Sequence, residues 1–131
     1  MFVYKEWDRF CSGIFKLGIE CIQNPRDKYN IRATYYVQSY LIQDLKNIKL
    51  LKKISELGHE VTYHYDVLDS NDGNYEMAEV EFDVTLRGFE NIGLKVKTVC
   101  PHGNPVKERD GWSSNKDFFR AIGSTIGSLG A

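Results

Sequence analysis

The feature that most constrains the fold of this 131-residue chain is an alternation of strand-like and helix-like segments with short connections. Four apolar segments are predicted as strands, the first of them very short: 2–4, 31–37, 61–65 and 94–100. Four segments with apolar residues at helical spacing are predicted as helices: 8–21, 41–57, 78–89 and 115–122. Such alternation predicts βαβ units and a parallel sheet. We therefore expect one α/β domain over 1–131, with residues 122–131 as a frayed tail.

The charge balance and the cysteine pattern exclude several classes of protein. A formal net charge of -1 provides no basic field for nucleic acid or for an anionic membrane surface. No run of about 18 apolar residues predicts a membrane span, and the first residues lack the apolar stretch of a signal peptide. The three cysteines show no Cys-x-x-Cys spacing, which argues against a disulfide framework and a structural zinc site. We therefore expect a cytoplasmic protein.

Polar side chains collect where the predicted strands end. Ligands of parallel α/β folds bind at the carboxyl ends of the strands. The residues at these ends are Glu6 and Asp8, then Tyr35, Tyr36 and Gln38, then His64, Tyr65, Asp66 and Asp69, and finally His102 and Asn104. Carboxylates and histidines are ligands of zinc and similar divalent ions. Because a bound metal lowers the pKa of its water to roughly 7, this pattern suits metal-assisted hydrolysis.

Each of these residues also has a purely structural interpretation. Glu6 and Asp8 are acidic residues in the position of a helix cap. His64 alternates with tyrosines along its strand and suits a hydrogen-bonded core histidine. His102 lies in Pro-His-Gly-Asn-Pro, where it can serve turn geometry. The segment 69–74 has the composition of a solvated loop. No single residue establishes a metal site. The site is predicted because these residues share the carboxyl edge of the predicted sheet.

Three motifs of the chain resemble the polysaccharide deacetylase (NodB-homology) superfamily, in particular its branch in bacterial surface-polysaccharide gene clusters. They are Ala-Thr-Tyr-Tyr-Val at 33–37, Leu-Gly-His-Glu-Val at 57–61 with Tyr-His-Tyr-Asp at 63–66, and Thr-Val-Cys-Pro-His-Gly-Asn-Pro at 98–105. The similarity spans about residues 4–120. The resemblance implies part of a distorted (β/α) barrel, a divalent metal ion such as zinc, and hydrolysis of acetyl groups on a carbohydrate substrate.

The resemblance also implies residue roles. Asp8 and His64 match metal ligands, and either Asp66 or Asp69 would complete the set. Glu6 stands at the position of the catalytic base, where the family has an aspartate, and His102 matches a catalytic turn residue near the substrate. The expected substrate contacts are Tyr36, Tyr65 and Asn104. The family's second metal histidine is replaced here by Leu68.

The chain is shorter than the barrels of this family. We expect about half a barrel, whose open parallel edges favour self-association or a partner that covers them. The function that we expect is deacetylation of a sugar or glycan, impaired in this short chain, and two alternatives to it stay open. One is a non-catalytic remnant that binds metal or sugar, and the other is a flavodoxin-like α/β domain whose similarity is accidental.

Overall fold

A computed structural model describes residues 31–121 of the chain. Its elements are β1 (Thr34–Val37), the 3₁₀ helix η1 (Ser39–Ile42), α2 (Leu45–Glu56), β2 (Glu60–Tyr65), α3 (Val67–Ser70), α4 (Tyr75–Asn91), β3 (Val99–Pro101) and a helical turn at 117–121. Several predictions lie outside the described residues: the strand at 2–4, the helix at 8–21, the tail at 122–131, and the candidate residues Glu6 and Asp8.

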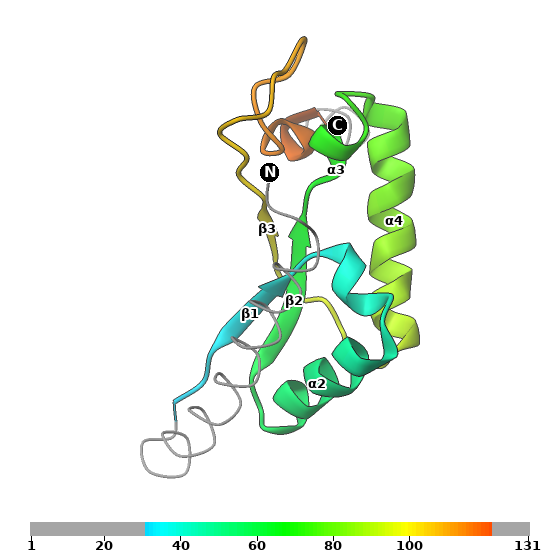
Figure 1. Cartoon of the computed structure of the whole chain (residues 1–131), viewed down its shortest axis with the longest axis vertical. Helices are drawn as coiled ribbons and strands as arrows, with labels where there is room; N and C mark the ends of the chain where they lie inside the picture. The colour runs from blue at the N-terminus through cyan, green and yellow to red at the C-terminus, as the bar shows by residue number, and fades with distance from the viewer. Residues whose placement is uncertain (1–30, 122–131) are drawn as a thin grey trace, which may run out of the picture.

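The three described strands form one parallel sheet in the order β1-β2-β3 (Figure 1). Tyr36 pairs with Thr62 between β1 and β2, and His64 pairs with Cys100 between β2 and β3. All three carboxyl ends therefore lie at the same edge of the sheet, next to α3. The predicted α/β fold with alternating β/α units and a parallel sheet is confirmed.

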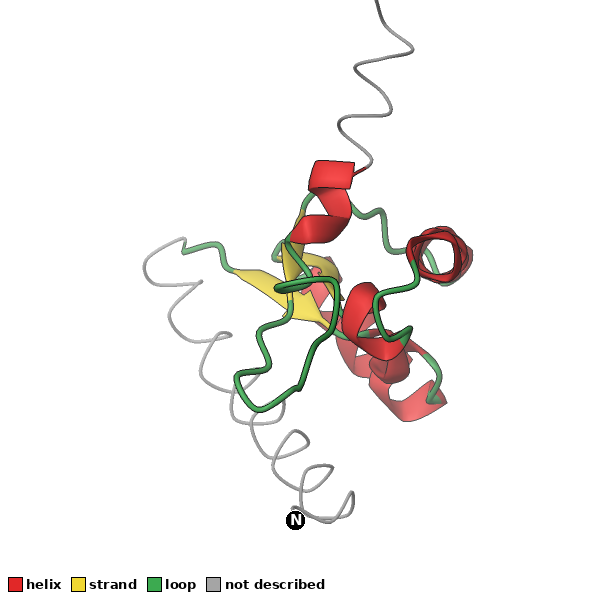
Figure 2. Ribbon diagram, turned by 90° about the horizontal axis from the view of Figure 1, so that it is seen from above, coloured by secondary structure: helices red, strands yellow, loops and turns green. Residues whose placement is uncertain are grey.

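Alternation along β2 separates the two faces of the sheet. Val61, Tyr63 and Tyr65 are buried on the face that packs against the helices, with exposed fractions of 4%, 1% and 2%. Figure 2 shows the described helices gathered on one side of the strands. The intervening residues Thr62 and His64 point to the opposite face, because successive strand side chains alternate.

The core is built from aromatic and aliphatic side chains of β2, α2 and α4. Tyr63 contacts Phe82 and Phe89 of α4, with ring centroids 5.4 and 5.6 Å apart. Leu51 and Ile54 of α2 belong to the same cluster and are each 1% exposed. Full burial of such a side chain stabilises the fold by about 1.5–3 kcal/mol. The two helices are therefore held to the sheet by one continuous apolar core.

Helix α4 begins and ends at residues that favour those positions. The side chain of Asn74 accepts a hydrogen bond from the Met77 amide at 3.0 Å, which caps the first turn. Gly93 follows the last turn with a φ of 84°, a conformation that other residues adopt at a cost. The predicted third helix is therefore present, and it is longer than the span 78–89 at both ends.

The predicted helix over 41–57 is divided in two. The 3₁₀ helix η1 comes first, and the Asp44 side chain then caps α2 by accepting a hydrogen bond from Lys46 at 2.7 Å. Leu45 is 66% exposed, because it occupies the first turn after the break. The predicted loop at 69–74 likewise begins inside α3.

The last strand is shorter than the span 94–100 and includes Pro101. Just before β3, the carbonyl of Thr98 accepts a hydrogen bond from the Thr62 hydroxyl. Proline is tolerated at the end of β3 because the next amide, that of His102, donates to the Tyr65 carbonyl at 2.8 Å.

Candidate functional site

Two histidines meet at the carboxyl edge of the sheet. His64 belongs to β2 and His102 directly follows β3, and the parallel pairing of these strands brings their rings together. His64 Nε2 and His102 Nδ1 lie 3.1 Å apart, and the ring planes are nearly perpendicular at 88°. One nitrogen of this pair donates a hydrogen bond to the other, and the tautomers decide which.

The surroundings of His64 favour its neutral form. Burial lowers its pKa from the ordinary value of 6.5, and repulsion from His102 lowers it further, while the backbone of Cys100 and the charge of Asp66 oppose this shift. Its Nδ1 is buried and has no hydrogen-bond partner of ordinary geometry among the described residues. A neutral imidazole retains a lone pair, which both metal binding and proton transfer require.

Asp66 supplies a carboxylate next to the histidines. Its Oδ1 accepts a hydrogen bond from Asn115 Nδ2 at 2.8 Å. Burial raises the pKa of Asp66 above its ordinary value, although the Asn115 bond and the nearby His102 lower it in part. Asp66 is therefore a positioned carboxylate that is less fully solvated than a surface one.

These groups line a hollow of about 750 Å³ at the carboxyl end of the strands. Its lining residues are Gln38, Ser39, Tyr40, His64, Asp66, Ser70, Glu81, His102, Asn104 and Val106. Four of the predicted site residues, His64, Asp66, His102 and Asn104, thus lie together. A hollow of this size is in the range that holds a small-molecule ligand.

The other described candidates lie elsewhere. Tyr65 is 2% exposed, because its ring packs in the core against Phe82 and Phe118, so it presents no surface to a substrate. Tyr36 is 42% exposed on β1, and its hydroxyl lies 3.3 Å from the hydroxyl of Thr98, outside the lining of the hollow.

Asp69 is occupied by other groups. Arg109 donates to both of its oxygens at 2.7 Å, and Trp112 and Asn115 add hydrogen bonds of 2.8 and 3.2 Å. Its side chain is only 4% exposed. Of the two carboxylates that were expected to complete the metal set, Asp66 is therefore the one that lines the hollow.

Asn115 is a site residue that the sequence did not reveal. Its Oδ1 accepts hydrogen bonds from the amides of Leu68 and Asp69, both at 3.0 Å. Its Nδ2 donates to Asp66, Asp69 and the His102 carbonyl. It is completely buried. Asn115 therefore joins the segment after β2 to the segment after β3, and no local pattern around it signals this role.

The chemistry of the hollow fits a divalent metal only in part. Two imidazoles and a carboxylate are donor types that zinc accepts. Within residues 31–121, however, no group of three or more His, Cys, Asp or Glu side chains is placed to hold a metal ion together. The predicted ligand Asp8 and the predicted base Glu6 lie outside this range. The described residues can therefore provide part of a coordination set.

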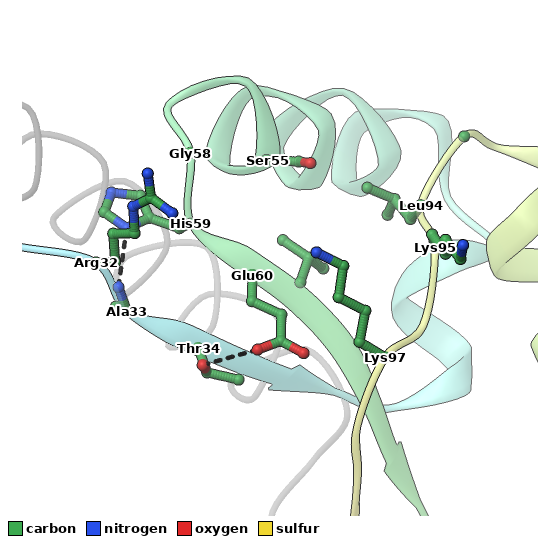
Figure 3. A pocket seen from close by; sticks show the side chains of 12 residues that line it. Arg32, Ala33, Thr34, Ser55, Gly58, His59, Glu60, Leu94, Lys95 and Lys97 are labelled. Atoms are coloured by element: carbon green, nitrogen blue, oxygen red, sulfur yellow. Dashed lines mark hydrogen bonds between the residues drawn. The ribbon is translucent and has the colours of Figure 1, made fainter.

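A second hollow, of about 500 Å³, lies at the amino end of the strands (Figure 3). Three basic side chains line it, those of Arg32, Lys95 and Lys97, together with Glu60, which accepts a hydrogen bond from Thr34 at 3.1 Å. Helices α2 and α4 end beside it. Because helix carboxyl ends carry partial negative charge, they and Glu60 offset these cations, and this hollow is a poor site for an anion.

Comparisons with known proteins add no identification. No protein-family model, no curated protein and no solved structure matches the chain. In the part of the chain that the structure describes, no helix is both long enough and apolar enough to cross a membrane. What the fold and the site define is an α/β domain with a histidine pair and a carboxylate at the carboxyl edge of its parallel sheet.

Proposed function

We propose that this protein is a metal-dependent hydrolase that removes acetyl groups from a sugar or glycan, as its resemblance to polysaccharide deacetylases implies. The observation that carries the proposal is the 3.1 Å contact between His64 and His102 in a hollow that Asp66 also lines. The sequential strand order β1-β2-β3 is the order that part of a (β/α) barrel requires, and it supports the same proposal.

The described residues have definite tasks in this proposal. A divalent metal, when bound, polarises an acyl carbonyl and lowers the pKa of its water to about 7. His64 is held neutral at neutral pH and offers a nitrogen lone pair. Asn115 fixes one oxygen of Asp66. Gln38 and Asn104 place amide groups on the wall of the hollow, where they can hydrogen-bond sugar hydroxyls.

Two observations favour the non-catalytic alternative, in which the domain binds metal or sugar without turnover. Asp69 is occupied by Arg109, and residues 31–121 hold no group of three metal-ligating side chains. In this case the same hollow would bind a carbohydrate, and the acetyl group would stay on it.

The test is acetate release from N-acetylated and O-acetylated sugar oligomers by the full chain in the presence of zinc. We expect release by the wild type, loss in His64→Ala and full retention in Asp72→Asn. Asp72 is the matched control, because its carboxylate is 82% exposed and pairs with Lys107 outside the hollow. Saturable sugar binding without acetate release would support the alternative. If the full chain neither binds the sugar nor releases acetate, both functions are contradicted.

A further inference from the structure

Helices α2 and α4 carry opposite charges, although the whole chain has a formal net charge of only -1. Helix α2 has four lysines and one glutamate, a formal charge of +3, whereas α4 has five carboxylates and one arginine, a formal charge of -4. We infer that a second copy of this chain docks on these helices, with α4 of one copy against α2 of the other. The contact is independent of the proposed hydrolase activity.

An apolar stripe runs along α4 on the side opposite its buried face. Met77, Val80 and Val84 follow one another at spacings of three and four residues, which places them on one face of the helix, and they are 55%, 60% and 60% exposed. Valine is a weaker helix former than most residues and is usually buried. The two exposed valines therefore give α4 neither helix propensity nor core packing, and a covering surface would remove them from water.

The exposed carboxylates of α4 lie beside this stripe. They are Glu76, Glu79, Asp83 and Glu90. Glu79 is three residues from Glu76 and four from Asp83, so these neighbours repel one another on the helix surface. No described residue forms an ion pair with any of the four. The carboxylates therefore destabilise α4 by mutual repulsion, and a positive surface placed over them would relieve it.

Helix α2 has the complementary surface. Its four lysines are exposed: Lys46, Lys49, Lys52 and Lys53. They too stand three or four residues apart, and none of them forms an ion pair within residues 31–121. Leu45 lies four and seven residues before Lys49 and Lys52, on the same face, and is 66% exposed. Helix α2 thus presents a positive face that includes an exposed apolar side chain.

Charge decides which surfaces of two copies meet. Two α4 helices placed face to face would bring carboxylates against carboxylates, and two α2 helices would bring lysines against lysines. Only α4 against α2 pairs opposite signs. Because both helices lie on the same side of the sheet (Figure 2), this contact can form twice in a dimer with two-fold symmetry. The apolar part of the contact is small, so we expect weak and reversible association.

The experiment reverses the two charged faces one at a time in the full chain. The α4 variant combines Glu79→Lys, Asp83→Lys and Glu90→Lys, and the α2 variant combines Lys46→Glu, Lys49→Glu and Lys52→Glu. All six positions are exposed, so both variants should fold, which circular dichroism checks. Sedimentation equilibrium measures the mass over a wide range of concentration. We expect the mass of the wild type to rise with concentration toward that of a dimer, and each variant alone to associate at least about tenfold more weakly.

A mixture of the two variants provides the decisive readout. In the α4 variant both helices are basic, and in the α2 variant both are acidic, so each variant repels itself and attracts the other. We expect the mixture to associate about as strongly as the wild type. The matched control combines Glu108→Lys and Asp110→Lys, which reverse two exposed carboxylates of the loop after β3 and should leave association unchanged.

The apolar stripe is tested without a change in charge. Val80→Ala combined with Val84→Ala should weaken association by about three- to tenfold, because less apolar surface is covered in the contact. The same variant should keep or raise the free energy of unfolding, because alanine is the better helix former and both positions are exposed in the single chain.

The possible results separate clearly. Weak association of each charge variant alone, restored in their mixture, would support the contact between α4 and α2. A wild type that stays monomeric at every concentration would overturn it. Charge variants that each associate as strongly as the wild type would also overturn it, and would place the contact elsewhere, such as at the sheet edges. None of these results depends on acetate release, so the proposed hydrolase stands or falls separately.

Discussion

The carboxylate of Asp69 and the guanidinium of Arg109, 40 residues apart in the chain, form two hydrogen bonds of 2.7 Å each. Such a two-pronged pair fixes both direction and distance. It ties the loop after β3 to the short helix α3 after β2. The histidines and Asp66 lie at the base of these two segments, so this ion pair helps to set the shape of the hollow.

The ion pair predicts a loss of stability in acid. Arg109, and to a smaller degree Trp112, hold the pKa of Asp69 below its ordinary value. A carboxyl with a lowered folded-state pKa stabilises the fold above its unfolded pKa of about 3.9, and this stabilisation disappears as the pH falls through the folded-state pKa. We expect the free energy of unfolding of the wild type, measured by urea denaturation, to fall below about pH 4, by at most about 1.4 kcal/mol per pH unit from this group.

Asp69→Asn should lack this part of the acid dependence and be less stable than the wild type at pH 7. Asp72→Asn, which alters an 82% exposed carboxylate, should follow the wild-type curve. Parallel acid curves for Asp69→Asn and the wild type would show that the pair does not couple to folding.

Replacement of Asn115 should destabilise the fold severely. Asn115→Ala removes the acceptor of the Leu68 and Asp69 amides and the donor to the His102 carbonyl, and all of these groups are partly or fully buried. We expect a loss of about 3 kcal/mol in the free energy of unfolding, measured by urea denaturation.

The matched variant Asn115→Asp keeps the acceptor and loses the donor. It also places a third carboxylate beside Asp66 and Asp69. It should therefore be destabilised at pH 7 and recover in part as the pH is lowered toward 4. A variant Asn115→Ala as stable as the wild type would show that water replaces the amide without cost.

Two glycines with positive φ allow a test of the packing of Trp112. Gly73 has a φ of 79° and Gly111 a φ of 94°. A Cβ at Gly73 would overlap the six-membered ring of Trp112, whereas a Cβ at Gly111 would meet no atom within 4 Å. Gly111→Ala should lower the free energy of unfolding by about 1–2 kcal/mol, because the only penalty is an alanine in a backbone conformation of positive φ.

Gly73→Ala should cost more than Gly111→Ala, because it also displaces Trp112 from its 2.8 Å hydrogen bond to Asp69. Tryptophan fluorescence reports the displacement of Trp112, and urea midpoints report the loss of stability. Trp112→Phe keeps an aromatic ring and removes the N–H, so it distinguishes ring packing from the hydrogen bond. Equal losses in the two alanine variants would show that the loop yields freely at Gly73.

Loss of the hydrogen bond from the Thr62 hydroxyl to the Thr98 carbonyl should open the chain locally just before β3. Thr62 is fully buried, and its hydroxyl holds the chain where a longer strand was expected. Thr62→Val keeps the shape and removes the donor, which should cost about 1 kcal/mol and speed amide hydrogen exchange over 96–99. Thr62→Ser is the control that keeps the hydroxyl. Unchanged exchange in Thr62→Val would show that the segment is held by packing alone.

Much of the candidate site could be predicted because its residues follow strands. His64 and Asp66 end one strand, and His102 and Asn104 follow the next, so parallel pairing suffices to bring them to one edge. Tyr65 does not share this position, because it is buried. It is one residue from His64, and the alternation of side chains turns it into the core.

The sequence by itself determined the local elements and their class. Helix α4, with Asn74 at its start and Gly93 after its end, and the apolar strand β2 follow from the chemistry of a few neighbouring residues. Tertiary structure alone decided which polar groups stay available. Asp69 and Asp66 look alike in sequence, but Arg109 occupies one and leaves the other in the hollow. Such pairings depend on distances between remote segments, and those distances exist only after the core has packed.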